Sequence, residues 1–444
     1  MDQTFMKERK ILPLVLSMSL PMVLSMAVNS LYNIVDSYFV ARVSEKAMTA
    51  LALVYPVQNL ITAIGVGFAI GMNAIIAFYL GAEDGDNANR ATTQGMILSF
   101  IHGLILTVVC IVGMPWFLGM FSKDSEVIGM ALTYSNRAFL FSVVITIGVA
   151  FEKLFQAVGQ MKVSMFCMLA GCLSNIVLDP LMIFGIGPFP AMGIAGAAYA
   201  TGIGQTVSLA AYLICYLVRP TQAKISMAYA KPNKNVMKKV YSVGIPAALN
   251  IALPSMLISA LNGILAGFSE KYVLVLGVYY KLQTFIYLTG NGIIQGIRPL
   301  MGYNYGAGEY GRVKKIFGTA LKLSVLVMAA GTLISWLVPE QLIGLFTNSQ
   351  ETIQIGVTAL KLISLGFVVS AVSVTCSGAL EGLGMGKESL WIALMRYTVV
   401  IIPAAWIFSR FLGANGVWLA FGFAEAVTAV GAYYIYKKRV HLNV

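Results

Sequence analysis

The chain has 444 residues, of which 58% are hydrophobic and 11% charged, with a formal net charge of +12 and a mean hydropathy of +0.81. A soluble domain carries roughly 25% charged residues, so this composition excludes a chain whose main solvent is water. The basic residues lie in short loops and form no patch with interleaved aromatic residues, which excludes nucleic acid as a partner.

Twelve apolar runs follow one another along the chain, separated by polar residues, glycines or prolines. Each is long enough to cross a hydrocarbon core about 30 Å thick, and none alternates as barrel strands do. The sequence therefore predicts an all-α integral membrane protein with twelve transmembrane helices. The predicted ranges are 12–38, 49–80, 92–118, 128–150, 163–186, 192–218, 237–264, 272–300, 316–338, 352–378, 389–411 and 415–436.

The two halves of the chain are related by a repeat at a constant offset of 225 residues. Pro21 matches Pro246, and the glycines at 65, 67 and 71 match those at 290, 292 and 296. Late in each half the offset falls to about 220, which indicates a short insertion near 185–192. Six spans per half make the repeats parallel, a design in which the transport site lies between two lobes.

Loop charge predicts the lobe boundary and the orientation. The longest polar connection, 219–236, is predicted to be a cytoplasmic linker between an N-lobe over 1–218 and a C-lobe over 237–444. Nineteen Lys and Arg residues of the loops fall on the side of the N-terminus and five on the opposite side. Because cytoplasmic loops carry the excess of basic residues, both termini are expected to be cytoplasmic.

Two carboxylates, Asp36 and Asp179, lie inside predicted spans of the first half. Charges within a membrane are costly, so both are candidate functional residues. Their matches at the 225-residue offset are Leu261 and Ala404. The fold is thus duplicated, whereas the acidic pair is not.

The surroundings of Asp179 indicate a site for a small cation. Asn175 precedes Asp179 by one helical turn, and Pro180 leaves the carbonyl of Ile176 without its helical donor. If the first span packs against the fifth, Asp36 joins these oxygen ligands, which suit a hard cation such as Na⁺. The same pair of carboxylates is equally suited to carry a proton. The alternative is that Asp36 lies at the membrane surface and Asp179 caps a kink.

The embedded charges of the second half are basic. Lys281, with Tyr280 and Gln283 beside it, is a candidate for lining a substrate cavity, and Arg298 is a second basic candidate. Three further basic residues are expected to extend to the membrane surface: Lys322, Lys361 and Arg396.

The glycines at 65, 67 and 71 follow no predicted strand and precede no Lys-Ser or Lys-Thr, so they indicate close helix packing rather than a phosphate loop. No Walker A motif, HExxH or serine nucleophile elbow occurs. We therefore expect no catalytic residues and no cofactor, and a transporter driven by an ion gradient rather than an enzyme.

Four segments, taken together, resemble the multidrug and toxic compound extrusion (MATE) transporters over nearly the whole chain: Asn33–Val40, Asn175–Gly185, Met192–Thr201 and Gln295–Ala307. The resemblance implies a V-shaped pair of six-helix lobes, and export of drug-like, amphiphilic and often cationic compounds by antiport with Na⁺ or H⁺. It also implies an N-lobe cation site of Asp36, Asn175, Asp179 and Thr201, of which Thr201 is added by resemblance alone. Some members use carboxylates of spans seven and ten, and the predicted ranges of those spans contain none.

A flippase for a lipid-linked sugar is the alternative function, because that substrate favours a basic cavity for its pyrophosphate. Lys281, Arg298 and Arg137 are the residues that support this alternative. For either function we expect a monomer in contact with membrane lipid. Family resemblance and loop charge together place it in a bacterial plasma membrane.

Overall fold

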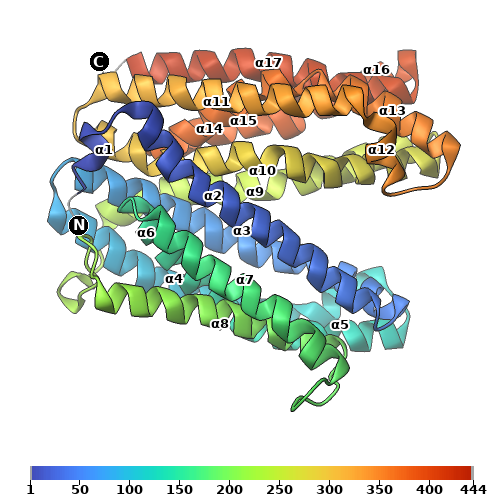
Figure 1. Ribbon diagram of the computed structural model, residues 1–444, viewed down its shortest axis with the longest axis horizontal. Coiled ribbons are helices and arrows are strands. Elements are labelled where there is room, and N and C mark those ends of the chain that lie inside the picture. The colour runs from blue at the N-terminus through green and yellow to red at the C-terminus, as the bar shows by residue number, and fades with distance from the viewer. Residues whose placement is uncertain (1–2, 442–444) are drawn as a thin grey trace. The chain divides into compact units, whose positions relative to one another are not determined.

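The computed structural model describes residues 3–441, so the ends of the two predicted lobes, 1–2 and 442–444, lie outside the described residues. Every regular element in the described part of the chain is a helix (Figure 1). Eleven helices there are long and apolar enough to cross a membrane, and a pair bent by 53° makes a twelfth span. The prediction of a twelve-span, all-α membrane protein is confirmed.

Each predicted run corresponds to one span, and most helices extend beyond the apolar ranges by several residues, whereas the predicted ranges 163–186 and 192–218 overrun the facing ends of α7 and α8 by two residues each. The first six spans are α2 (Ile11–Ala41), α3 (Glu45–Gly81), α4 (Gly85–Phe121), α5 (Ser125–Ala138) continued through η1 (Phe139–Phe141) by α6 (Ser142–Ala157), α7 (Met161–Phe184) and α8 (Ile194–Val218). The second six are α9 (Lys234–Ala266), α10 (Glu270–Gly306), α11 (Tyr310–Leu337), the bent pair α13 (Gln350–Ser364) and α14 (Phe367–Gly382), α15 (Gly386–Leu394) continued through η3 (Met395–Val399) by α16 (Ile401–Leu412), and α17 (Ala414–His441). Short helices lie outside these spans: α1 (Phe5–Glu8), η2 (Met227–Tyr229) and α12 (Pro339–Gly344).

The chain forms two compact units, whose limits fall inside helices α2 and α9. Unit 1 contains Leu24–Ala248, and unit 2 contains Thr4–Val23 together with the chain from Leu249 onward. The first half of α2 thus belongs to the unit built from the second repeat, and the first half of α9 belongs to the unit built from the first. Pro21 and Pro246, which match in the repeat, each lie a few residues before the point of division.

In unit 1, the first half of α9 packs closely against two glycines of α3. A Cβ atom at Gly67 would lie 2.4 Å from the backbone nitrogen of Ala248, and one at Gly71 would lie 2.3 Å from the carbonyl oxygen of Val240. No side chain fits at those distances, so the absence of a Cβ is what lets the two backbones approach.

The same close packing at glycines occurs in unit 2, between α10 and the first half of α2. A Cβ at Gly292 would lie 2.5 Å from Cγ2 of Val23, and one at Gly296 would lie 2.5 Å from Oγ of Ser19. These glycines match Gly67 and Gly71 at the 225-residue offset. The prediction that the repeated glycines serve close helix packing is confirmed, and the structure adds which helix packs on them.

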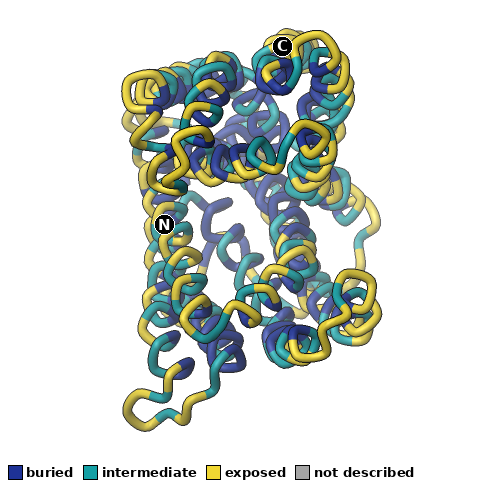
Figure 2. The backbone as a smooth tube through the Cα atoms, turned by 90° about the vertical axis from the view of Figure 1, so that its right-hand side faces the viewer, coloured by how far each residue is buried: buried dark blue, intermediate teal, exposed yellow. Residues whose placement is uncertain are grey.

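Within each unit the buried side chains gather between helices, and many large apolar side chains point outward. In unit 1, α7 and α8 pack along each other, and α3, α4 and α6 form a second group; in unit 2, α10, α11, α14 and α17 pack together. Figure 2 shows buried backbone inside both bundles. Exposed residues such as Trp116 and Phe411, 74% and 82% exposed, are suited to contact lipid chains.

The predicted linker is held against unit 1 rather than hanging free. The side-chain amide of Gln94, on α4, donates to the carbonyl oxygens of Tyr229 (3.1 Å) and Lys231 (2.6 Å). The backbone N–H of Lys224 donates to Oδ1 of Asn89 at 2.6 Å. These bonds satisfy the polar backbone of the segment, which therefore has a defined conformation.

Each unit contains a buried ion pair, although the two pairs do not lie at matching positions of the repeat. In unit 1, Nζ of Lys153 lies 2.8 Å from Oε1 of Glu152 and donates to Oε1 of Gln156 at 3.0 Å. In unit 2, Nη2 of Arg298 lies 2.7 Å from Oε2 of Glu381. Oε1 of Glu381 accepts from Asn250 at 2.9 Å and from Ser389 at 3.0 Å, so both oxygens of this carboxylate have a polar neighbour.

The first repeat has neutral residues at the positions that match the ion pair of Arg298 and Glu381. At the 225-residue offset Arg298 matches Asn73, and its partner Glu381 matches Gln156. A neutral pair of amides in the first repeat is therefore replaced by a pair of opposite charges in the second, each of which requires the other.

We predict that Gly67→Leu destabilises the protein by at least 1–3 kcal/mol, because the new side chain overpacks the contact with α9. The melting temperature in detergent measures this. Gly113→Leu is the matched control, since a Cβ at Gly113 in α4 has nothing within 4 Å. Equal melting temperatures for the two variants would contradict the packing described for α3 and α9.

We also predict that Glu381→Gln lowers the melting temperature because it leaves the Arg298 guanidinium buried without its counter-charge, at a cost of about 3 kcal/mol. The double variant Arg298→Asn with Glu381→Gln recreates the amides of the first repeat and is expected to recover most of that loss. A double variant that is as unstable as the two single changes added together would show that the two residues act independently.

Candidate functional site

Three helices of unit 1 bring the predicted cation-site residues together. Asp36 lies near the end of α2, Asn175 and Asp179 lie one turn apart on α7, and Thr201 lies on α8. Because α7 and α8 pack along each other, Asn175 and Thr201 face one another across the contact. Asp179 is completely buried, and Asn175 and Thr201 are 2% and 7% exposed.

The two carboxyl groups of this acidic pair touch. The side chains of Asp36 and Asp179 are in hydrogen-bonding contact with each other. Asp36 is partly buried in α2, and its Oδ1 atom is buried without a hydrogen-bond partner. Asp36 thus faces Asp179 inside unit 1.

The side-chain amide of Asn175 links Asp179 to the backbone of α8. With its side-chain amide oriented to satisfy both neighbours, Asn175 donates to Oδ2 of Asp179 at 3.0 Å and accepts from the backbone N–H of Thr201 at 3.0 Å. The hydroxyl of Thr201 lies 3.4 Å from the Asn175 amide. The backbone of α8 therefore fixes the amide that fixes Asp179.

Two carboxylates in hydrogen-bonding contact cannot both be ionised and unaccompanied in a buried place, because their repulsion is not screened by water. The pair must share a proton or hold a cation between its oxygens. The unpartnered Oδ1 of Asp36 is one oxygen available to such an ion. The carboxyl groups of Asp36 and Asp179 and the hydroxyl of Thr201 offer oxygen ligands, which are the type that hard cations prefer.

Tyr134 is a member of this site that the sequence did not indicate. It lies on α5, is 1% exposed, and its hydroxyl is in hydrogen-bonding contact with Thr201 and with the side-chain amide of Gln58, 3.4 Å away. A tyrosine carries no charge, so the cost of burial that identified the two aspartates gives no signal for it. Its hydroxyl closes the polar cluster on the side of α5.

The four predicted cavity residues of the second half all lie on α10, but they do not form one cluster. Arg298 is seventeen residues beyond Lys281, which is about 26 Å along a helix. Lys281 is exposed, with Nζ 5.6 Å from the ring centroid of Phe346, while Gln283 is partly buried. The hydroxyl of Tyr280 is buried without a partner, which leaves one polar atom available beside Lys281.

Arg298 is instead engaged by Glu381 of α14, as described above. Glu381 was missed because the predicted range of the tenth span ends at residue 378, whereas α14 extends to Gly382. A carboxylate therefore does lie in the tenth span, 4% exposed and already paired.

A second buried ion pair lies in unit 2, between η3 and α17. Nε of Arg396 donates to Oε1 of Glu425 at 2.7 Å, and its Nη2 donates to the hydroxyl of Tyr287 at 3.2 Å. Arg396 is 8% exposed, so the expectation that it extends to the membrane surface is wrong. The π-helical turn of η3 carries Arg396, and a counter-charge inside the bundle takes the place of water.

Comparison with curated proteins gives relatives over almost the full length. The multidrug export protein MepA of Staphylococcus aureus (strain bovine RF122 / ET3-1) is 25% identical over 94% of this chain and 91% of its own length. The MepA protein of Staphylococcus saprophyticus is 26% identical over the same shares.

Solved structures share the fold. A crystal structure of MATE in complex with MaL6 matches with a TM-score of 0.93 at 23% identity, covering 100% of this chain and 99% of that one. An outward-facing multidrug resistance MATE transporter of the MOP superfamily matches with a TM-score of 0.93 at 24% identity over the same shares.

The family model MatE matches residues 21–181 and again 246–407. The two matches begin at Pro21 and Pro246, so the model finds the same duplication that the sequence shows. The predictions of a MATE-type transporter and of a protein that is not an enzyme are confirmed, and the chain belongs to the MatE family of multidrug and toxic compound extrusion transporters.

Proposed function

We propose that this transporter exports drug-like, amphiphilic and often cationic organic compounds by antiport with Na⁺ or H⁺. The observation that carries the proposal is the contact between the Asp36 and Asp179 carboxyl groups inside unit 1. The coupling ion binds there, with Asn175 holding one carboxyl group and Thr201 completing the oxygen set.

The chemistry of the pair supports an ion that enters and leaves. Without an ion, two buried like charges repel, which favours uptake of a proton or a sodium ion. With an ion bound, the pair is neutralised and the ligands can close around it. Because Asn175, Thr201 and Tyr134 contribute neutral groups, the carboxylates supply the charge and the neutral groups supply orientation.

Coupling then follows from linkage between the ion and the substrate. An ion that lowers the affinity for substrate must have its own affinity lowered by substrate to the same factor. A gradient that loads the ion from one side therefore releases substrate on that side, provided that access alternates between the two faces. No ATP-binding motif is required for this cycle.

The substrate class rests on the relatives. The MepA proteins are named as multidrug export proteins, and they align with 94% of this chain. A small organic molecule is consistent with a chain whose described residues lie mostly in membrane helices.

The contacts of the basic residues argue against the alternative function, a flippase for a lipid-linked sugar. Arg298 is neutralised by Glu381 at 2.7 Å. Arg137 donates to the carbonyl oxygen of Thr133 at 2.8 Å and lies over the ring of Tyr199. Of the three basic residues that would hold a pyrophosphate, only Lys281 is exposed without an ion pair in the described part of the chain.

The cellular setting completes the proposal. The protein acts as a monomer in a bacterial plasma membrane, with both termini cytoplasmic as the nineteen loop cations on that side favour. Export in this orientation moves compounds away from the cytoplasm.

We predict that Asp179→Asn and Asp36→Asn each reduce ion-driven export at least tenfold, because a single carboxylate no longer needs the coupling ion to neutralise its neighbour. Efflux of a fluorescent cationic dye from vesicles of known orientation, under a sodium gradient and a pH gradient applied separately, measures this and identifies the ion. Glu126→Gln is the control, since that carboxylate is exposed in the same unit. Unchanged export in both aspartate variants would refute the proposed coupling site.

We predict that Thr201→Val raises the ion concentration for half-maximal dye efflux about fivefold, the effect of losing about 1 kcal/mol of interaction. Thr201→Ser keeps the hydroxyl and is expected to behave like the unmodified protein. Both variants keep the backbone N–H that Asn175 uses, so the position of Asp179 is preserved. The role given to the hydroxyl fails if valine and serine give the same ion dependence.

A further inference from the structure

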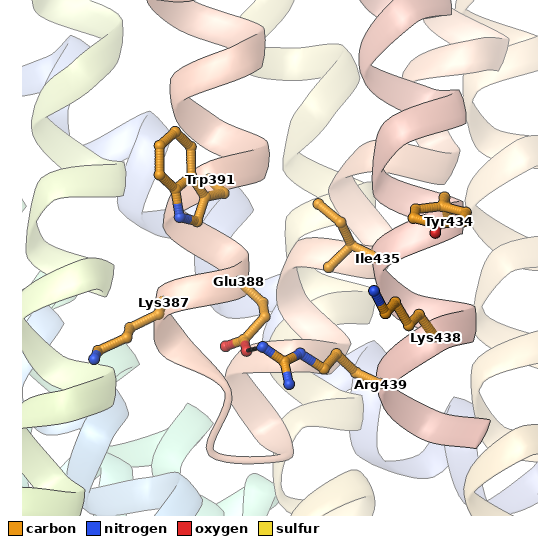
Figure 3. Close-up of a pocket in the computed structure, with 7 residues that line it drawn as sticks. All are labelled: Lys387, Glu388, Trp391, Tyr434, Ile435, Lys438 and Arg439. Carbon is orange, nitrogen blue, oxygen red and sulfur yellow. Dashed lines mark ion pairs between the residues drawn. The ribbon is translucent and has the colours of Figure 1, made fainter. Parts of the chain in front are cut away.

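A basic and aromatic cavity lies on unit 2, between the start of α15 and the end of α17, far along the chain from the acidic pair. Its volume is about 410 Å³. The residues that line it are Lys387, Glu388, Trp391, Tyr434, Ile435, Lys438 and Arg439 (Figure 3). The proposed transport cycle uses none of them.

In this cavity the basic side chains lie nearer the loops and the aromatic side chains lie deeper along the helices. Lys387 and Trp391 are four residues apart on one face of α15, and Tyr434 and Lys438 are four residues apart on one face of α17. The helices run in opposite directions, so both lysines lie at the loop end and both aromatic residues lie about 6 Å deeper. Figure 3 shows this order, with the basic groups below and Trp391 and Tyr434 above.

The cavity has an excess of positive charge that the protein does not neutralise. Arg439 is paired with Glu388, with Nη2 and Oε1 2.9 Å apart. Lys387 and Lys438 are exposed, and neither has an ion-pair partner in the described part of the chain. Three cations and one carboxylate leave a net charge of +2, offered to whatever occupies the space.

The two aromatic residues of the cavity are exposed. Trp391 and Tyr434 are 61% and 64% exposed. Such rings concentrate at the level of the lipid headgroups, where one end contacts acyl chains and the other meets water. A ligand that fills this cavity must therefore have an anionic head and an apolar body.

We propose that this cavity, defined by Lys387, Lys438, Arg439, Trp391 and Tyr434, is a binding site for one anionic phospholipid. The phosphodiester of the lipid lies between the two lysines, and its glycerol and acyl chains lie against Trp391 and Tyr434. The loops at this end of the helices carry most of the chain's Lys and Arg residues, so the lipid belongs to the cytoplasmic leaflet.

The repeat provides an internal comparison, because unit 1 contains only part of the same set. Lys162 and Phe166 match Lys387 and Trp391 at an offset of 225, and Arg219 matches Arg439 at 220. The matches of Tyr434 and Lys438 are Ile214 and Val218, which are apolar. The lipid site is thus particular to the second repeat, as the acidic pair is particular to the first.

The test measures phosphatidylglycerol bound to the full chain in detergent by native mass spectrometry. The double variant Lys387→Gln with Lys438→Gln is expected to weaken the first bound lipid about 30-fold, which corresponds to about 1 kcal/mol for each lysine. The matched control, Lys162→Gln with Arg219→Gln, removes two charges from unit 1 and is expected to change that affinity less than twofold.

Glu388→Gln is expected to change the lipid affinity in the opposite direction. It removes the negative partner of Arg439, so the cavity gains net positive charge and binds the lipid several-fold more tightly. The proposal is overturned if the two double variants weaken binding equally, if phosphatidylcholine binds as well as phosphatidylglycerol, or if Glu388→Gln has no effect. Displacement of the lipid by millimolar inorganic phosphate would also overturn it and would assign the cavity to a soluble anion. Dye efflux, measured in parallel, distinguishes this result from a failure of the proposed export.

Discussion

Inside a lipid bilayer a charged side chain persists only where a counter-charge, a proton or a set of hydrogen bonds replaces water. Three of the embedded carboxylates of the described chain have a basic partner within 2.8 Å: Glu152 with Lys153, Glu381 with Arg298, and Glu425 with Arg396. Asp36 and Asp179 have only each other, with Asn175 to hold one of them. An acidic pair without a basic partner is neutralised by a proton or a cation, which is the feature on which the proposed ion coupling rests.

The two repeats share the way their helices pack, but they differ in which buried positions carry charged residues. The small residues that let half-helices approach occur in both repeats, as Gly67 and Gly292 show. An exposed ion pair also recurs, Lys46 with Glu126 and Lys271 with Glu351, joining the starts of two spans in each unit. The acidic pair occurs only in unit 1, and the lipid cavity is lined by residues that only unit 2 has in full.

Asp124, in the loop before α5, adds a second carboxylate to the ion pair between Lys46 and Glu126. Asp124 accepts from the backbone N–H of Glu126 and is paired with Lys46, and both contacts hold the pKa of the Asp124 carboxyl below its usual range. All three groups are exposed, so salt screens them and they orient helix ends more than they stabilise the fold.

The sequence predicted the spans and the acidic pair for the same reason, which is that both depend on the cost of placing a group in lipid. Asp36 and Asp179 followed from that cost, and Asn175 from its spacing of one helical turn. The pairing of Arg396 with Glu425 did not follow, because the two residues belong to different helices and their contact depends on tertiary packing. The sequence also offered no reason for a cation at Arg298, because its partner Glu381 lies in the last turn of α14, beyond the apolar range predicted for that span.

The division of α2 and α9 between the units is the feature that hydropathy could least reveal, since the apolar pattern continues through both helices. It also bears on how an ion site in one unit can affect the other. Asp36 lies thirteen residues beyond Val23 on α2, about 20 Å along the same helix, and Val23 packs against Gly292 inside unit 2. A helix is stiff over that length, so an ion that changes the position of Asp36 acts on an element whose first half is built into the other unit. In the proposed antiport, the glycines that accept this half-helix are the contacts through which Asp36 and unit 2 would be linked.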